Sequence, residues 1–221
     1  HFALELLSQQ NRILEGIVIP SKDIINCKGK KVLVIGGGDT GSDCVGTANR
    51  HKAASVTQIE IMPQPPVGHN PATPWPLYPQ VLKTSSSHEE GCIRRWNLAS
   101  VRFIGDKNTL KGVEVEEIEW QPTEKEGRPE MRKTGSTEVI EADLVFLAMG
   151  FIHPEQEGLV KELSLAVDAR GNIAVDPVTN QIADTNLFAS GDAVSGASLV
   201  VRAMASGRKV AAAIDQYLRN K

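Results

Sequence analysis

The sequence predicts an α/β protein, and two strand–turn–helix segments are the main observations behind this prediction. The first is KKVLVIGGGDTGSDC at Lys30 to Cys44, in which Val32–Ile35 has the apolar character of a buried strand. The second is TNLFASGDAVSGASLVVRAMASGRKVAAAI, in which a short strand at Leu187–Ala189 leads through an SGD turn to a helix from about Ser198 to Leu218. Alternating strands and helices of this kind are typical of α/β folds.

The first segment contains Gly36, Gly38 and Gly41 in the spacing GxGxxG. In such a turn, Gly36 permits a tight bend, Gly38 lets the backbone approach a pyrophosphate, and Gly41 lets the helix pack close to the strand. The helix predicted from residue 40 to about residue 51 would offer its free N–H groups to an anion. The pattern therefore predicts a dinucleotide-binding turn.

A second strand, with a carboxylate at its end, is predicted in SVTQIEI at Ser55 to Ile61, where Glu60 stands nineteen positions after Gly41. A carboxylate at this place commonly accepts hydrogen bonds from the ribose hydroxyls of NAD, whereas an Arg suits the 2′-phosphate of NADP. No Arg or Lys lies between residues 53 and 78, which favours NADH on charge alone. The alternative is that Glu60 is only a solvated carboxylate at a strand end.

Composition excludes several classes of partner. The chain has 221 residues and a formal net charge of −3 without a long basic run, which argues against nucleic-acid binding. No apolar stretch approaches the roughly 20 residues that span a bilayer, so we expect no membrane segment and a cytoplasmic location. The cysteines Cys27, Cys44 and Cys92 form neither CxxC nor a metal-ligand cluster, and we expect reduced thiols and no metal site.

The middle of the chain is expected to form a loop and then a second sheet. Residues 63–79 contain seven prolines and predict a loop packed on the body of the protein, with a polyproline ligand as the alternative. A β-hairpin with its turn at residues 106–108 should follow, then a charged loop at residues 124–137 and a single strand at residues 137–150. Val113, Val115 and Ile118 would face the nucleotide-binding unit. His69, His88 and His153 fall in expected loops with local roles.

Near the C-terminus, Gly191 would free the backbone and Asp192 would point its carboxylate towards a ligand sugar or diphosphate. Asp192 could instead be a turn or capping residue, which is the common role of such dipeptides. The helix starting near Ser198 would offer free N–H groups. The predicted C-terminal helix is rich in alanine, and its small side chains would let backbone or a flat cofactor approach closely. The alternative is a tightly packed core helix. The alanines are Ala203, Ala205, Ala211, Ala212 and Ala213.

Three segments together, GGGDTGSDC, ADLVFLAMG and TNLFASGDAVSGASLVVRAMASGR, resemble the flavoproteins with two dinucleotide-binding domains, in which an NAD(P)H domain is inserted into an FAD domain. QIEIMPQPP, ATPWPLYP and TSSSHEEG add a resemblance to the small (β) subunits of glutamate synthase. The reductase half of dihydropyrimidine dehydrogenase is a related possibility. The first residues, FALELLSQQNRIL, have the spacing of a helix already under way, and we expect the chain to be a piece of a longer protein.

The resemblance implies a Rossmann-like, three-layer (ββα) NAD(P)H-binding domain plus the C-terminal part of an FAD-binding domain. Residues 1–22 would be an N-terminal helix and connection from the FAD domain. Residues 23–150 would be the NAD(P)H domain, and residues 151–221 the C-terminal segment of the FAD domain. The implied cofactor-binding residues are Gly36, Gly38, Asp39, Thr40, Gly41, Glu60, Gly150, Gly191, Asp192, Ser198, Leu199 and Val200. The last five would contact FAD.

In that family, electrons pass from NADPH or NADH to FAD and, through iron–sulfur clusters, to a large subunit that makes glutamate from glutamine and 2-oxoglutarate. The resemblance implies this large subunit as partner, and [4Fe–4S] clusters only in a full-length subunit. Because the cofactors carry the chemistry, we expect no catalytic acid, base or nucleophile here, and an inactive isolated segment. Some relatives place an Arg pair after the second strand, where this chain has Ile61, Met62 and Pro63. The alternatives are a flavin reductase with another acceptor and a non-catalytic dinucleotide-binding module.

Overall fold

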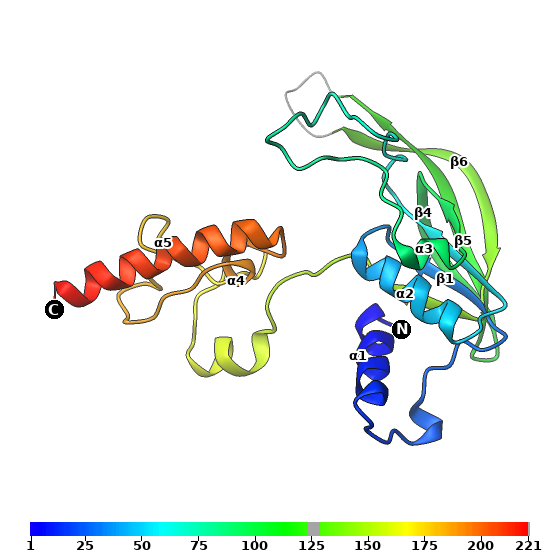
Figure 1. Cartoon of the computed structure of the whole chain (residues 1–221), viewed down its shortest axis with the longest axis horizontal. Helices are drawn as coiled ribbons and strands as arrows, with labels where there is room; N and C mark the ends of the chain where they lie inside the picture. The colour runs from blue at the N-terminus through cyan, green and yellow to red at the C-terminus, as the bar shows by residue number, and fades with distance from the viewer. Residues whose placement is uncertain (123–128, 221) are drawn as a thin grey trace. The chain divides into compact units, whose positions relative to one another are not determined.

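The computed structural model describes residues 1–122 and 129–220, which form two compact units, His1–Met149 and Gly150–Lys221 (Figure 1). The first unit is built around a parallel sheet with the strand order β3-β2-β1-β7. Its strands are β1 (Lys31–Ile35), β2 (Ser55–Ile59), β3 (Ile93–Arg95) and β7 (Leu144–Leu147). In the register of the sheet, Val32 of β1 lies between Val56 of β2 and Leu144 of β7. The apolar sequence of β1 fits this interior position, because such strands are covered on both faces.

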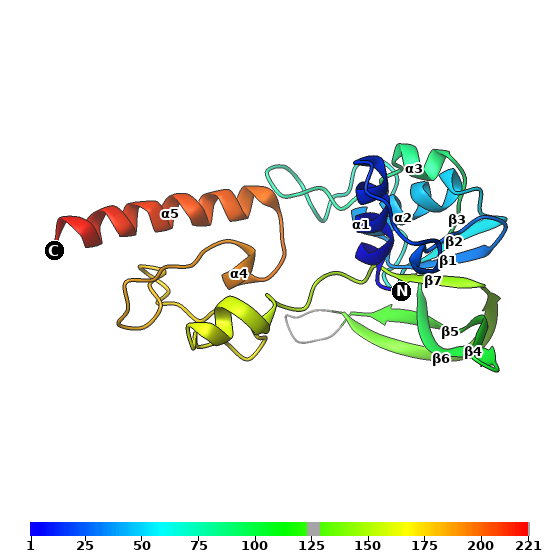
Figure 2. The same cartoon turned by 90° about the horizontal axis from the view of Figure 1, so that it is seen from below.

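Helices cover one face of the parallel sheet: α1 (Ala3–Leu14), α2 (Asp39–Arg50) and α3 (Ser86–Glu89) (Figure 2). A single-turn helix, η1 (Ser21–Asp23), follows α1. Leu6 of α1 and Val45 of α2 share a buried cluster with Phe146 of β7. The amino terminus is also fixed, because the His1 ammonium donates a hydrogen bond to the Val145 carbonyl at 3.0 Å. By its packing, α1 therefore belongs to the first unit.

An antiparallel sheet covers the other face, as Figure 2 shows, and consists of β4 (Leu98–Asp106), β5 (Thr109–Gln121) and β6 (Glu130–Glu141). Lys107 and Asn108 both have positive φ in the β4–β5 turn, which matches the twist of a two-residue hairpin and confirms the predicted turn. Val113 and Val115 of β5 are buried against Leu33 and neighbouring residues of the parallel sheet. Helices, parallel sheet and antiparallel sheet are the three layers that the sequence predicts.

The predictions for the segment between β5 and β7 were wrong in two respects. Residues 130–137, expected in a charged loop, belong to β6, while residues 123–128 lie outside the described part of the chain. Nearly all of β6 is exposed, so its polar sequence is that of a solvated edge strand. The single strand expected at 137–150 is two strands in different sheets. Between them, Asp143 exchanges two hydrogen bonds of 2.8 Å with the backbone of Lys31, which directs the chain from one sheet to the other.

The proline-rich segment is closed by hydrogen bonds of its own. The Leu82 amide donates to the Pro66 carbonyl at 2.9 Å, and the Asn70 side chain donates to the Gln80 carbonyl at 2.7 Å. Trp75 lies in the loop that we expected to pack on the body, but its side chain is 92% exposed. The loop is therefore ordered by internal bonding instead of by burial of this indole.

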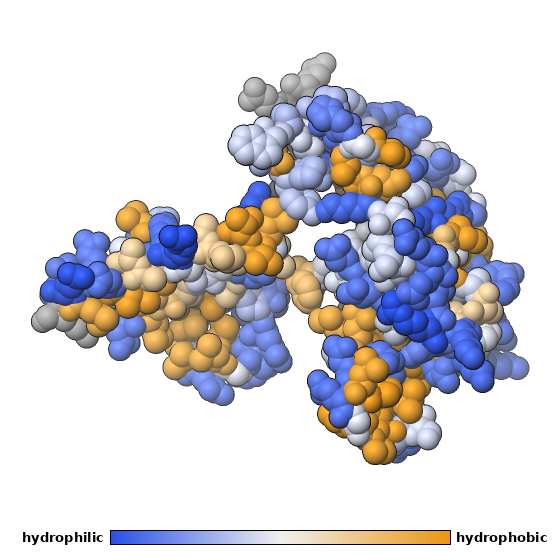
Figure 3. Space-filling model, viewed as in Figure 1, coloured by the Kyte–Doolittle hydropathy of each residue, from blue (hydrophilic) through white to orange (hydrophobic). Residues whose placement is uncertain are grey.

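The second unit has a small core of Val160, Ile173 and Ile182 and little regular structure. Its elements are η2 (Gln156–Val160), α4 (Asp192–Ser195) and α5 (Val200–Arg219). The predicted strand at Leu187–Ala189 is only a single bridge between Gln181 and Phe188, and the predicted helix begins two residues later than expected. An apolar patch lies over the start of α5, visible as orange in Figure 3, and contains Val200, Val201 and Met204. None of the helices in the described part of the chain is long and apolar enough to cross a membrane.

Removing the Leu33 side chain should destabilise the first unit, because Leu33 is completely buried between the two sheets. We expect Leu33→Ala to lower the free energy of unfolding by about 2–5 kcal/mol. All three tryptophans lie in this unit, so urea unfolding followed by tryptophan fluorescence reports on it. Val18→Ala, at a position that is 92% exposed, is the control. A loss no larger than that of the control would contradict the sheet-on-sheet packing.

Candidate functional site

The glycine turn between β1 and α2 is built from backbone approaches that only glycine allows. Gly36 has φ of +119°, and a Cβ there would overlap the Ala148 carbonyl oxygen. A Cβ at Gly41 would overlap the Gly36 carbonyl oxygen and lie 2.8 Å from the Gln58 amide nitrogen. Gly38 differs, because no atom lies within 4 Å of a Cβ placed there. Two of the glycines therefore serve the fold, and the third leaves open space above the turn.

Helix α2 begins at Asp39, one residue earlier than predicted, with Gly38 as its N-cap residue. Among the residues that the structure describes, no side chain accepts a hydrogen bond from the N–H groups at this end of the helix. The first N–H groups of a helix have no partner within it and favour a negatively charged ligand. Thr40 lies in this first turn. The open space over Gly38 is thus next to unclaimed donors.

Glu60 follows β2 and is bonded to the turn. Its Oε2 accepts the Gly37 N–H at 2.6 Å, and its Oε1 accepts the Met62 N–H at 3.0 Å. The carboxylate is half-buried and connects the glycine turn with the chain after β2. The description of Glu60 as a merely solvated carboxylate is therefore wrong, and its contact with a ribose stays a prediction.

A partly buried polar network supports the turn. Gln58, which is 2% exposed, donates from Nε2 to the Gly36 carbonyl at 2.9 Å. The Oε1 atom of Gln58 lies 2.9 Å from Nε2 of His88, and His88 Nδ1 lies 3.0 Å from the Ser85 hydroxyl. The Ser85 hydroxyl in turn contacts the hydroxyl of Ser42 in α2. The network therefore joins the turn to two helices, and His88 is in α3 instead of the loop that we expected.

His88 is neutral in this network. Burial, and to a smaller extent the charge of Arg94, lowers the pKa of His88 below its ordinary value. The neutral ring donates Nε2–H to Gln58 Oε1, because the amide group of Gln58 already donates to Gly36. Nδ1 then accepts from the Ser85 amide at 3.2 Å. A proton on Nδ1 would leave that amide without its acceptor.

The turn opens into a cavity of about 390 Å³, a volume within the range of small-molecule sites. Gly37, Gly38 and Asp39 form one part of its lining, together with Glu60. Helix α2, the proline-rich loop, α3 with the segment before it, and β3 with the residue after it form the rest: Ser42, Met62, Pro63, Pro65, Tyr78, Val81, Leu82, Lys83, Ser85, His88, Arg94 and Trp96. It lies beyond the carboxyl ends of β1 and β2, where open α/β sheets bind their ligands. The sequence indicated the turn and Glu60 but not the contribution of the loop and β3.

In the second unit, the predicted residues lie around the turn between α4 and α5. Gly191 has φ of +65°, and its N–H donates to the Ser206 hydroxyl of α5 at 3.1 Å. Asp192 starts α4 and is exposed, and within the described residues its carboxylate accepts no hydrogen bond. Leu199 is the N-cap residue of α5, with Ser198 before it and Val200 after it.

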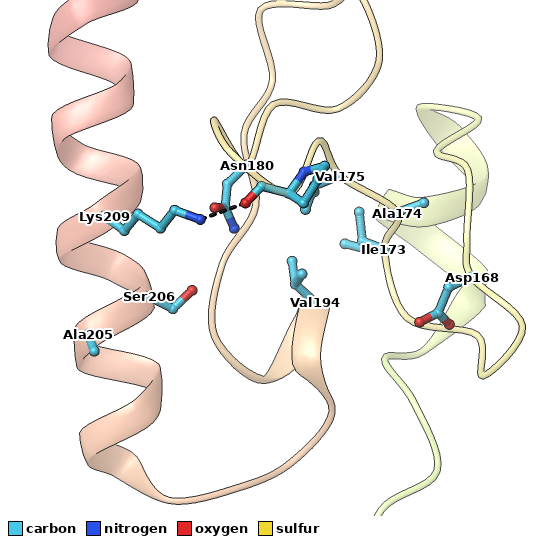
Figure 4. Close-up of a pocket in the computed structure, with 10 residues that line it drawn as sticks. Asp168, Ile173, Ala174, Val175, Asn180, Val194, Ala205, Ser206 and Lys209 are labelled. Atoms are coloured by element: carbon cyan, nitrogen blue, oxygen red, sulfur yellow. Dashed lines mark hydrogen bonds between the residues drawn. The ribbon is translucent and has the colours of Figure 1, made fainter.

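A separate pocket of about 590 Å³ lies between α5 and the segment 173–180 in this unit (Figure 4). Ser206 and Lys209 extend from α5 towards it, and Lys209 donates to the Pro177 carbonyl at 2.6 Å. Its lining does not include Gly191, Asp192 or the start of α5. The structure therefore brings those residues together at one turn without placing them in this pocket. Gly150 is the first residue of the unit, with φ of +90°.

Comparison with known proteins identifies the family of the chain. A family model described as pyridine nucleotide-disulphide oxidoreductase matches residues 94–207, about half of the chain. The chain belongs to this family. The resemblance deduced from its motifs is confirmed by relatives that match along the whole chain.

One relative, from Mycobacterium tuberculosis, is named glutamate synthase (NADPH) small chain and is 42% identical over 99% of this chain and 44% of its own length. Another, from Schizosaccharomyces pombe, is named glutamate synthase (NADH) and is 36% identical over 100% of this chain and 11% of its own length. The chain thus spans less than half of these relatives. Among solved structures, thioredoxin reductase of T. acidophilum matches with a TM-score of 0.55 and 25% identity, over 85% of this chain and 52% of that one.

The cysteines of this family member are not arranged for disulfide chemistry. All three are free, and Cys27 and Cys44 are buried. Burial raises the pKa of Cys27 to about 11 and that of Cys44 to about 12. Thiols in such surroundings are protonated and unreactive at neutral pH. The described part of the chain therefore carries no dithiol centre.

The pKa of His88 leads to a prediction for the dependence of stability on pH. An unfolded histidine has a pKa of about 6.5, so the unfolded chain binds more protons than the folded one just below this pH. The contribution of neutral His88 is complete above about pH 6.5 and is lost as the pH falls through its folded pKa. We expect the wild type to lose more unfolding free energy between pH 7 and pH 5 than His88→Asn. His69→Asn, at an exposed position, is the control, and equal pH slopes for wild type and His88→Asn would refute the neutral network.

Proposed function

We propose that this protein is an NAD(P)H-dependent flavin oxidoreductase whose first unit binds the dinucleotide at the glycine turn. The observation that carries this proposal is the open space above Gly38, at the N-terminus of the twelve-residue helix α2 and at the mouth of the cavity. A methyl group placed on Gly38 would touch no neighbouring part of the protein, so a bound pyrophosphate has room to approach the backbone there. Gly36 and Gly41 fix the path of the turn around that space.

The residues present fit a dinucleotide. Unclaimed N–H groups at residues 39–41 suit a pyrophosphate, and Glu60 borders the cavity where a ribose would lie. When bound, the nicotinamide supplies a hydride and the flavin accepts it, so the protein needs to bind and orient without acid or base catalysis. Gln58 and His88 have a positioning role, because they hold the Gly36 carbonyl and so the shape of the turn.

The flavin part of the proposal concerns the second unit. The family match extends through residue 207 and therefore includes Gly191, Asp192 and the start of α5. Asp192 is exposed and unbonded in the described structure, which leaves its carboxylate available to the hydroxyls of a flavin side chain. The exposed Val200 and the N–H groups at the start of α5 are the other parts of the proposed flavin contact. We propose FAD as the flavin on the resemblance of these motifs.

The finer assignment is the electron-input part of a glutamate synthase small subunit. It is supported by relatives of that name that are similar along the whole chain. On this proposal the partner is a large subunit, the reaction is glutamate formation from glutamine and 2-oxoglutarate, and iron–sulfur clusters occur only in the full-length subunit.

Replacement of Gly38 separates binding from folding. Gly38→Ala meets no neighbouring atom and keeps an ordinary φ of −79°, so the melting temperature should be unchanged. The added methyl group occupies the place of the pyrophosphate, and we expect at least about tenfold weaker binding of NADH and NADPH, or about 1.4 kcal/mol. Calorimetric titration measures this, with Gly207→Ala of α5 as the matched glycine control. Unchanged affinity in Gly38→Ala would show that no dinucleotide binds over the turn.

The final electron acceptor is identified with the full-length subunit and its large partner subunit. We expect NAD(P)H-dependent formation of glutamate from glutamine and 2-oxoglutarate, measured by glutamate production and loss of absorbance at 340 nm. If NAD(P)H is oxidised with a different electron acceptor and no glutamate forms, the proposal of a flavin reductase stands and the glutamate synthase assignment is refuted.

A further inference from the structure

Two cationic side chains line the cavity, although the segment directly after β2 contains none. Lys83 comes from the segment before α3, and Arg94 comes from β3. At the place where an Arg pair would recognise a 2′-phosphate, this chain has Ile61, Met62 and Pro63. The fold nevertheless brings positive charge to the cavity beside Glu60 from residues more than twenty positions further along.

The register of the sheet determines where Arg94 points. Arg94 pairs with Gln58 of the neighbouring parallel strand, and Arg95 pairs with Ile59. Side chains directly opposite each other project from the same face of a sheet, and successive residues alternate between faces. Arg94 therefore shares the helix-covered face with Gln58, whereas Arg95 projects to the other face and binds Glu138 of β6. Only one of these two adjacent arginines is directed to the cavity.

Arg94 and Lys83 are held together. Arg94 Nη1 donates to the Lys83 carbonyl at 3.0 Å, which fixes the segment before α3 against β3. The guanidinium of Arg94 lies 5.1 Å from the ring centre of Trp96, and the Lys83 ammonium lies 4.1 Å from that of Tyr78. The Arg94 distance is within the range of cation–π contacts, whereas the Lys83 ammonium contacts the Tyr78 hydroxyl. Each cation is thus placed beside an aromatic ring that also lines the cavity.

Neither cation is neutralised by an ion pair. Throughout residues 1–122 and 129–220, no carboxylate lies within 4.0 Å of the charged nitrogens of Lys83 or Arg94. The carboxylates that line the cavity are Asp39 and Glu60, and both oxygens of Glu60 already accept backbone N–H groups. A planar guanidinium and a mobile ammonium are the groups that proteins use to bind phosphate. The unpaired positive charge of this cavity is therefore suited to a phosphate group.

We infer that Arg94 and Lys83 recognise the 2′-phosphate on the adenosine ribose, so that the cavity selects NADPH over NADH. This inference rests on the proposed dinucleotide site and names its ligand. It differs from the preference for NADH drawn from the sequence, which considered only cations near β2 along the chain. Glu60 borders the same cavity, but its two backbone hydrogen bonds give it a role in holding the turn.

Binding measurements with matched ligands test the inference. The whole chain is titrated calorimetrically with NADPH and NADH, and with 2′,5′-ADP and 5′-AMP, which differ only by the 2′-phosphate. We expect tighter binding of the 2′-phosphorylated member of each pair. Arg94→Gln and Lys83→Gln should each reduce that preference about tenfold, because each weakens the binding of NADPH more than that of NADH. Lys83 is exposed, so Lys83→Gln tests the charge without risk to folding.

Arg12→Gln, on the exposed side of α1, removes the same charge from the same unit outside the cavity and is the control. An equal affinity for NADH and NADPH, or a preference that survives both cavity substitutions, would overturn the inference while leaving the dinucleotide site in place. Binding of no nucleotide to the wild type would instead refute the proposed function, and the inference with it.

Discussion

The close approach of the Gly36 carbonyl to helix α2 is the constraint on which the site depends. The carbonyl group occupies the space that a Cβ of Gly41 would need, and the Gln58 amide donates a hydrogen bond to the same oxygen. Helix and turn are therefore fixed to each other by backbone contact, with a side chain of β2 as the third partner. The free N–H groups of α2, the open space over Gly38 and the position of the Gly37 amide at Glu60 all follow from that contact.

The sequence predicted the parts of the site whose signals are local. The roles of Gly36, Gly38 and Gly41 depend only on the backbone of the turn that contains them. The apolar residues of β1 before them show that this turn follows a buried strand. The network of Gln58, His88, Ser85 and Ser42 has little local signal, because two of its bonds join residues 30 and 43 positions apart and form only when α3 packs beside α2. A polar Gln58 between the apolar Val56 and Ile59 of β2 was the one available clue.

Arg94 and β6 show two further ways in which sequence reasoning was incomplete. Arg94 joins the cavity because β3 pairs with β2 across an insertion of more than thirty residues, and distance along the chain gives no indication of that. For β6, polar composition was interpreted as a loop. An edge strand exposed along most of its length satisfies its backbone by pairing with β5 and has no need of apolar residues. Hydrogen bonding between strands, more than side-chain burial, determines that element.

The parallel sheet also has consequences for how the first unit is made. Strand β1 lies between β2 and β7, and the Lys31 backbone bonds to Asp143 across 112 positions of the chain. During synthesis, β1 and β2 emerge early, but the other edge of β1 stays unpaired until β7 has left the ribosome. Such long-range parallel pairing is slow to form and exposes a strand edge in the meantime. The whole antiparallel sheet is therefore translated before the parallel sheet is complete, and only two residues separate the end of that last strand from the second unit.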